Sequence, residues 1–334
     1  MGNFFSHQQD LDDVLKSSGS ALSCFKDQKV TIFGGTGFLG RWLVFGLIEA
    51  NIQLSLGIRL ELVTTNISRA NSIFGDLNHE LLRIITFQDY KKAAGYSDYI
   101  FHGATPTVNS EISISATNNT PVIIADEIAK IAKLNRNKPT VMHLNSGAIY
   151  GEQSVSNRNQ EETATITLNP SNSYTRTKLE IDQILNSASK NDLITYKSPR
   201  LYAFAGPHLP LDEHFAIGNF VSSALQGKPI FIHGNSNTTR SYLYPSDLVH
   251  CLLQLSVSDS HKIINIGSDI PINMLSLAKK VSTIVGNVPI IQSGEDKAPS
   301  NYVPSITNLR EHVTDKAFIP IDEILVRWVN WLKL

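Results

Sequence analysis

The segment from Val30 to Val44, VTIFGGTGFLGRWLV, crowds four glycines between two apolar runs. A run typical of a strand ends at Phe33, and a helical pattern begins near Phe38. The first glycine of the spacing G-x-x-G-x-x-G lets the chain turn, the second admits a pyrophosphate to backbone N–H groups, and the third lets helix and strand pack closely. The corner predicts a dinucleotide site built by Gly34, Gly37, Phe38, Leu39 and Gly40.

Strand-like runs alternate with helical patterns through the first two thirds of the chain, which is typical of a parallel sheet covered on both faces. The strand-like runs are residues 29–34, 60–65, 82–87, 98–103, 140–145 and 193–201, and the long helical patterns are 38–50, 120–134 and 174–189. We predict an α/β, Rossmann-type doubly wound parallel sheet with a smaller mixed C-terminal lobe. The expected divisions are an N-terminal helical extension (1–27), a dinucleotide-binding domain (28–202) and a substrate lobe (203–334), some of whose elements return to the sheet.

Composition narrows the class of partner. The 334 residues carry a net charge of −1, so no broad basic face is available for nucleic acid. Two cysteines fit a reducing compartment better than a disulfide framework. No apolar run reaches the roughly 18 residues that span a bilayer. We expect a soluble cytoplasmic protein with no membrane partner and no metal site.

The end of the second strand bears on the choice of dinucleotide. An acidic residue there would hold the adenosine ribose and repel a 2′-phosphate, but the chain has Thr65 and Asn66, with Arg69 just beyond. This favours NADP(H) over NAD(H), although Arg69 is equally typical of a solvated surface. Asp89, after the third strand, is a candidate for binding the adenine amine, with a surface turn as the alternative.

A second group of residues carries acid–base chemistry. Tyr174 and Lys178 are four residues apart, which places them on one face of a helix. An ammonium near a phenol favours the phenolate, so Tyr174 could exchange protons near neutral pH. Ser146 follows a strand and could hold a substrate oxygen. Together the three residues suit hydride transfer between a carbonyl and an alcohol.

The motifs GGTGFLG, FHGAT, NSGAIYG, YTRTK, RLYAFAGP and TRSYLYPSDL occur in the order and spacing of one family. The chain resembles the extended short-chain dehydrogenase/reductases, in their nucleotide-sugar epimerase/dehydratase branch, over about residues 28–334. The resemblance implies a Ser-Tyr-Lys triad and a homodimer formed through the helices around 120–134 and 174–190. It also implies a dinucleotide lined by His102, Gly103 and Ala104, Asn118 at the start of the dimer helix, Pro199 after the sixth strand, and Arg240 paired with the diphosphate of a nucleotide sugar.

Departures from the family pattern bear on the reaction. The dehydratases carry an Asp-Glu pair after the Ser or Thr, and the decarboxylases a Glu, whereas this chain has Gly147 and Ala148. This argues against dehydration and decarboxylation. Further candidates for contact with the sugar are Gly147, Ala148, His208, His214, Asn219 and His233, with capping or packing as the alternative role of the histidines.

We therefore predict a reductase that uses NADPH to reduce a keto group, C4, of a nucleotide-linked 6-deoxy-ketosugar, with Tyr174 as proton donor. The alternative is a nucleotide-sugar 4-epimerase with retained NAD. A non-catalytic dinucleotide sensor is the remote alternative, against which the intact triad of Ser146, Tyr174 and Lys178 argues.

Overall fold

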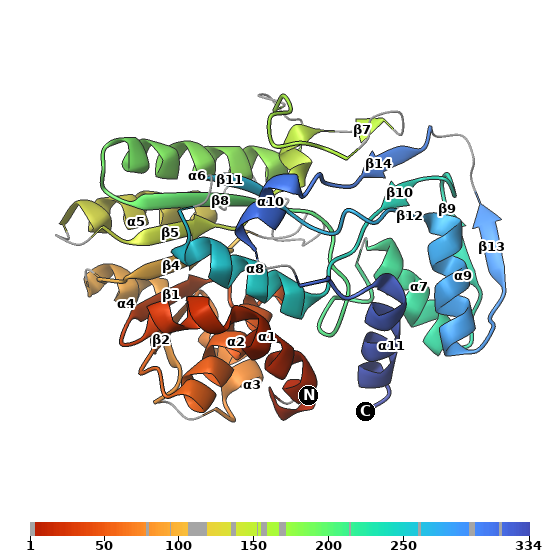
Figure 1. Ribbon diagram of the computed structural model, residues 1–334, viewed down its shortest axis with the longest axis horizontal. Helices are drawn as coiled ribbons and strands as arrows, with labels where there is room; N and C mark the ends of the chain where they lie inside the picture. The colour runs from red at the N-terminus through yellow and green to blue at the C-terminus, as the bar shows by residue number, and fades with distance from the viewer. Residues whose placement is uncertain are drawn as a thin grey trace.

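The computed structural model describes residues 4–77, 80–93, 95–105, 119–134, 138–151, 153–154, 159–166, 172–213, 215–259, 262–293, 298–313 and 316–334. Figure 1 shows a large layered body that contains the central sheet and a smaller lobe beside it. The parallel sheet and the second lobe are those predicted from the sequence.

The central sheet has the strand order β11-β8-β5-β4-β1-β2-β3, and β6 pairs with β8 off this path. Every pairing within it is parallel. Its strands are β1 (Lys29–Phe33), β2 (Arg59–Thr64), β3 (Arg83–Thr86), β4 (Tyr99–His102), β5 (Thr140–His143), β6 (Asn145–Ser146), β8 (Thr195–Leu201) and β11 (Ile263–Ile266). Six of these strand regions were predicted from apolar runs. β11 returns from the C-terminal part of the chain to form one edge.

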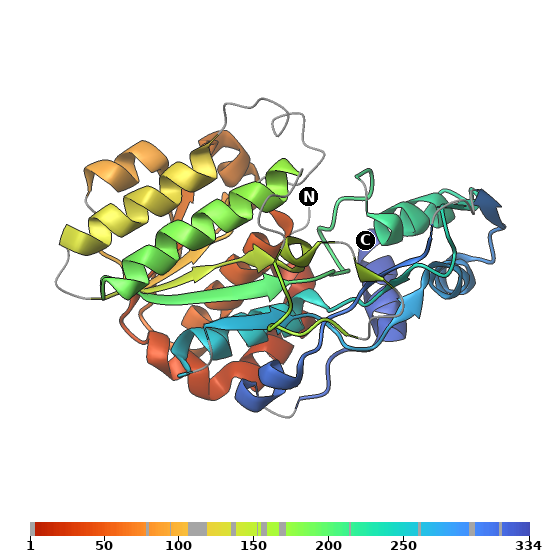
Figure 2. The ribbon, with the colours of Figure 1, turned by 90° about the horizontal axis from the view of Figure 1, so that it is seen from above.

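Two layers of helices cover the sheet, on opposite sides in Figure 2. One layer contains α1 (Gln8–Leu22), α2 (Phe38–Leu54) and α8 (Pro245–Val257), and the other contains α5 (Thr120–Leu134) and α6 (Ser173–Lys190). Alternate strand residues serve the two layers, because side chains along a strand point to opposite faces. Phe101 and Met142 join the core under α2 and α8, whereas their neighbours Ile100 and Val141 join the core under α5 and α6.

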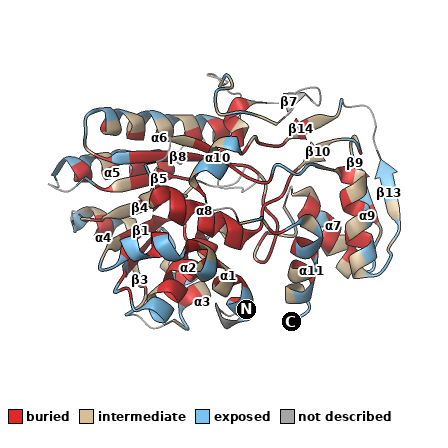
Figure 3. Ribbon diagram, viewed as in Figure 1, coloured by how far each residue is buried: buried red, intermediate tan, exposed pale blue. Residues whose placement is uncertain are grey.

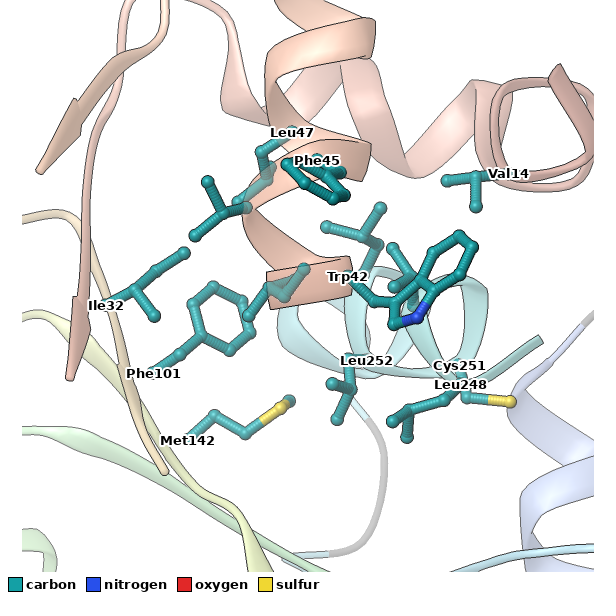
Figure 4. Packing of buried hydrophobic residues seen from close by; sticks show 14 of the residues in the cluster. Val14, Ile32, Trp42, Phe45, Leu47, Phe101, Met142, Leu248, Cys251 and Leu252 are labelled. Atoms are coloured by element: carbon teal, nitrogen blue, oxygen red, sulfur yellow. The ribbon is translucent and has the colours of Figure 1, made fainter. Parts of the chain in front are cut away.

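Figure 4 shows the first of these cores, in which Trp42 and Phe45 of α2 gather with Phe101 and Met142 of the sheet and Leu252 of α8. The Trp42 indole N–H donates to the Pro207 carbonyl at 3.0 Å, so this buried ring also satisfies its polar atom. This hydrogen bond therefore connects α2, the helix that follows the glycine corner, to the start of the second lobe.

The smaller lobe encloses a core of its own among α7 (Ala216–Leu225), α9 (Met274–Val285) and α11 (Ile321–Leu332). In Figure 3 the buried faces of these helices turn toward one another. Its strands are β9 (Ile230–His233) paired with β13 (Ile290–Ser293), and β12 (Ile272–Asn273), β10 (Thr239–Arg240), β14 (Ser300–Tyr302) and β7 (Gln153–Ser154) in that order.

The remaining described elements are short helices at the edges of these layers. They are η1 (Phe4–His7), η2 (Ser23–Phe25), α3 (Ile67–Phe74), α4 (Phe87–Lys92), η4 (Gly147–Tyr150) and α10 (Thr307–His312). Within the described ranges, no helix has both the length and the apolar character that a membrane span requires.

Candidate active site

The glycine corner between β1 and α2 shows why two of its glycines carry no side chain. Gly34 has a φ of +86°, and a Cβ there would lie 2.6 Å from the carbonyl carbon of Gly103. A Cβ at Gly40 would lie 2.3 Å from the Gly34 oxygen. Real Cβ atoms do not approach other atoms so closely, so the turn and the contact between helix and strand both need glycine at these positions.

Gly37 differs because its surroundings are open. It is exposed, and a Cβ there would meet only the Gly34 oxygen, at 3.4 Å. It is the N-cap residue of α2 and gives no side-chain cap, so none covers the first-turn N–H groups around Phe38 and Leu39. An uncapped helix start beside an open glycine fits a pyrophosphate group.

The carboxyl end of β2 carries the residues predicted to select the dinucleotide. Thr65, Asn66 and Arg69 are exposed, and the Asn66 side chain caps α3 by accepting the Arg69 N–H at 2.9 Å. Arg41, in the first turn of α2, has a buried Nε without a hydrogen-bond partner. Burial lowers the Arg41 pKa, and the nearby charge of Arg69 lowers it further. The charge of Arg69 therefore acts on Arg41, at a strand end where Thr65 and Asn66 take the place of a carboxylate.

Two predicted cofactor residues make contacts within the protein, and the predicted contact of Asp89 with the adenine stays a prediction. Asp89 lies in the first turn of α4, where its carboxylate accepts the Thr86 hydroxyl at 2.6 Å, so it serves as part of a helix cap. His102 has no exposed surface, and its Nε2 lies 2.9 Å from the Pro121 carbonyl. Burial lowers the pKa of His102 to about 3. The expectation that its ring lines the dinucleotide is wrong, because protein atoms cover it on all sides.

Gly103 and Ala104 follow β4 and remain partly exposed. The Gly103 N–H donates to the Phe33 carbonyl at 2.9 Å, which holds the end of β4 against the end of β1. Ligands of open parallel sheets bind at the carboxyl ends of the strands, where these two residues lie. They stay predicted contacts.

Pro199 is the clearest error of position. It lies inside β8, opposite Ile264, and not after the strand as the resemblance implied. The pairing of β8 with β5 stops at Lys197, and its pairing with β6 starts at Arg200. A proline is tolerated there because its missing N–H falls between the two pairings.

The structure brings Ser146, Tyr174 and Lys178 together. Asn172 caps α6 by accepting the Tyr174 N–H at 2.8 Å, which sets Tyr174 in the first turn of the helix and Lys178 in the next. The Ser146 hydroxyl, at the end of β6, lies near enough to the Tyr174 phenol to lower its pKa by hydrogen bonding. The Lys178 Nζ lies 5.6 Å from the centre of the Tyr174 ring and donates to the Leu144 carbonyl at 2.6 Å.

Burial is the largest cause of the pKa shifts of Lys178 and Tyr174. It lowers the pKa of Lys178 from 10.5 to about 7, and it raises the pKa of Tyr174 against the opposing effect of the Ser146 hydrogen bond. The expectation that Tyr174 exchanges protons near neutral pH differs from this result. Near pH 7 only part of the Lys178 population carries the charge that favours the phenolate.

A second phenol, Tyr302 of β14, reaches the same place and was missed from the sequence. Burial raises its pKa, and the nearby Ser146 hydroxyl and Ala148 backbone act in the opposite direction. Its ring lies 4.6 Å from that of Tyr202 between centres. A Cβ on Gly147 would lie 2.6 Å from the Tyr202 ring, so these aromatic rings occupy the space beside Ser146. No local pattern around a three-residue strand signals such a contact.

Arg240 lies on β10 within reach of this aromatic pair, its guanidinium 5.8 Å from the Tyr302 ring centre. It donates to the Thr239 carbonyl at 2.8 Å and to the Ser300 hydroxyl at 3.2 Å. No carboxylate pairs with it in the described ranges. A half-buried guanidinium without an acidic partner suits the predicted role toward a diphosphate.

The other residues predicted to contact the sugar lie on different elements of the structure. His208 uses both ring nitrogens within the protein, Nε2 at 2.8 Å from His7 and Nδ1 at 2.8 Å from Arg41, so neither is free for a sugar hydroxyl. Burial, and then the Arg41 charge, lower its pKa to about 2. The packing alternative fits His208. His233 lies on β9 and bonds to the Ser293 hydroxyl at 3.0 Å, and Asn219 is exposed on α7.

Two predicted residues, Asn118 and His214, lie outside the described residues. Among those that are described, no three side chains of the metal-ligating types converge.

Comparisons with known proteins agree with this fold. The model of the NAD dependent epimerase/dehydratase family matches residues 30–267. UDP-glucuronic acid decarboxylase 1 of Xenopus tropicalis is 20% identical over 315 residues, covering 92% of this chain and 73% of the relative.

Two solved structures share the architecture. UDP-N-acetylglucosamine 4-epimerase from Methanobrevibacter ruminantium M1 superposes with a TM-score of 0.79 at 22% identity, covering 92% of this chain and 99% of the other. UDP-glucuronic acid 4-epimerase from Bacillus cereus gives 0.75 at 19% identity, with 91% and 99% covered. The sequence-based resemblance is confirmed: the chain belongs to the NAD-dependent epimerase/dehydratase family.

Proposed function

We propose that this chain reduces a keto group, C4, of a nucleotide-linked 6-deoxy-ketosugar with NADPH. One observation carries the proposal: Ser146, Tyr174 and Lys178 converge at the carboxyl end of the sheet, and the positions after Ser146, Gly147 and Ala148, bring no carboxylate. Such a site can move one proton to or from a substrate oxygen. It lacks at these positions the additional acid that removal of water or carbon dioxide requires.

The reduced nicotinamide, when bound, supplies the hydride. Tyr174 gives its proton to the substrate oxygen as the carbonyl becomes a hydroxyl, and Ser146 holds that oxygen by a hydrogen bond. Lys178, whose pKa burial lowers to about 7, can take up a proton and pass one on close to neutral pH. Arg240 would bind the diphosphate of the substrate.

The NADP(H) preference rests on Arg41 and Arg69 beside the end of β2, since two guanidinium groups and no carboxylate favour a 2′-phosphate. Arg69→Ala should weaken NADPH binding by about tenfold and leave NADH binding unchanged, which titration calorimetry can measure. Arg59→Ala, at the other end of β2, is the control. Equal loss of affinity for both dinucleotides would refute the preference.

A nucleotide-sugar 4-epimerase is the second candidate, favoured by the two solved neighbours that carry that activity in their names. Both reactions need the same proton transfer. Purified protein incubated with a panel of nucleotide sugars and ketosugars distinguishes them. Consumption of NADPH with a ketosugar supports the reductase, whereas interconversion of sugars on tightly retained NAD, without net NADPH consumption, supports the epimerase.

We also propose a homodimer formed through α5 and α6, which pack against each other and leave Ile123 of α5 half exposed. Ile123→Glu should then convert a dimer to a monomer in light scattering. A monomeric wild-type protein would refute this interface.

A further inference from the structure

The face of α6 that carries Tyr174 and Lys178 continues to a third polar residue. Asp182 follows Lys178 by four residues, as Lys178 follows Tyr174, so the three side chains lie along one side of the helix. Asp182 is half-buried, and the proposed reaction gives it no part. Its hydrogen bonds nevertheless reach Asn145, the residue that precedes Ser146.

One oxygen of the Asp182 carboxylate collects three donors. The Ser198 hydroxyl donates to Oδ1 at 2.6 Å, the Tyr196 hydroxyl at 2.7 Å and the Asn145 amide at 3.3 Å. The donors come from β8 and β6, and all three are buried. Hydrogen bonds to a carboxylate are stronger than those between neutral groups, so Asp182 fixes these side chains against the helix.

Asn145 transmits that restraint to the residue that follows it. Its side-chain oxygen accepts the Ser146 N–H at 2.8 Å, and its amide also donates to the Ser198 hydroxyl at 3.1 Å. On the other side of Asn145, the Leu144 carbonyl accepts from Lys178 at 2.6 Å. Both peptide groups that flank Asn145 are therefore held by side chains of α6, one directly and one through the Asn145 amide.

This restraint matters because β6 is only two residues long and, among the strands that the structure describes, pairs only with β8. The Ser146 hydroxyl must meet the Tyr174 phenol, which is carried by a different element. We propose that Asp182 is a positioning residue that, through Asn145, holds Ser146 in register with Tyr174. One helix then sets both partners of the proton transfer. The catalytic part of this inference rests on the proposed function.

The experiment compares Asp182→Ala and Asp182→Asn with Glu180→Ala, which removes an exposed carboxylate from the same helix. Asp182→Ala should lower kcat by roughly tenfold to a hundredfold, because a small misplacement of a catalytic group is costly. KM and the dissociation constant for NADPH should stay within about twofold of the Glu180→Ala values, since ground-state binding is not involved. Asp182→Asn keeps an acceptor in place and should recover most of the rate, and it also covers the case in which the alanine variant fails to fold.

Hydrogen exchange gives a readout that does not depend on turnover. The peptide from 144 to 148 should exchange faster in Asp182→Ala than in Glu180→Ala, whether or not any substrate is turned over. If exchange is faster in Asp182→Ala but the wild-type protein turns over no ketosugar, the proposed reaction is refuted and the positioning of Ser146 by Asp182 still holds. Unchanged exchange, a kcat equal to that of Glu180→Ala, or an Asn variant as slow as the Ala variant would overturn the positioning role.

A double variant tests the route. If Asp182 acts through Asn145, the loss of kcat in Asn145→Ala combined with Asp182→Ala should be close to that of the larger single loss. Losses that multiply would show that the two residues act independently and would overturn the proposed path.

Discussion

Replacing Lys178 by methionine should make the protein more stable while removing its activity. The Lys178 side chain is 3% exposed, and its Nζ donates to the Leu144 carbonyl at 2.6 Å. Methionine has nearly the same length and no charge to bury. The substitution therefore removes the desolvation cost of a buried ammonium group.

The magnitude follows from the pKa of Lys178, which burial lowers from 10.5 to about 7. Because the unfolded chain binds this proton more tightly, the lysine opposes folding fully below about pH 7, and the opposition fades as the pH rises toward 10.5. At ~1.4 kcal/mol for each pKa unit, the opposition is about 4 kcal/mol near neutral pH and about 2 kcal/mol near pH 9. Loss of the hydrogen bond to Leu144 offsets about 1–3 kcal/mol.

Urea denaturation at several pH values measures the effect. Lys178→Met should raise the free energy of unfolding by about 1–3 kcal/mol near pH 7, and the gain should shrink by about 2 kcal/mol by pH 9. Lys190→Met, an exposed lysine at the end of the same helix, should show no such pH dependence. A variant less stable than wild type at pH 7, or a difference constant between about pH 7 and 9, would refute the reasoning.

Three further outcomes follow from the same geometry. Tyr174→Phe should lower kcat by about a hundredfold or more and leave the NADPH dissociation constant within about twofold, which steady-state kinetics and calorimetry can show; comparable turnover would remove Tyr174 from the mechanism. Gly40→Ala should destabilise the protein by more than about 2 kcal/mol in urea denaturation because its Cβ would lie 2.3 Å from the Gly34 oxygen, whereas Gly37→Ala should fold normally and lose dinucleotide affinity. Arg240→Ala should raise KM for the nucleotide sugar and spare kcat, so unchanged saturation would show that the diphosphate lies elsewhere.

The parts of the fold that local pattern determines were predictable. The glycine corner, the apolar strands and the Tyr174–Lys178 pair are encoded within short segments, and the structure places each near its expected position. Pro199 lies within β8 and within the strand-like run 193–201, and only the resemblance to the family placed it after that strand.

Contacts between distant segments account for the rest. His208 was a candidate for the sugar, but its ring is bonded to His7, 201 positions away in the sequence. Tyr302 reaches Ser146 from the C-terminal lobe, and nothing in its own strand marks it. Asp182 was missed because its carboxylate meets its three donors only where β8 and β6 pack against α6. Such contacts depend on packing and cannot be derived from spacing.

The most direct test of the account follows the hydride. Purified protein is incubated with a nucleotide-linked 4-ketosugar and NADPH deuterated at the transferable position, and the product is examined by mass spectrometry and NMR. We predict one deuterium on the sugar carbon that bears the new hydroxyl, and a rate about a hundredfold or more lower in Tyr174→Phe. Absence of deuterium from the sugar, or equal incorporation by Tyr174→Phe, would contradict the central claim.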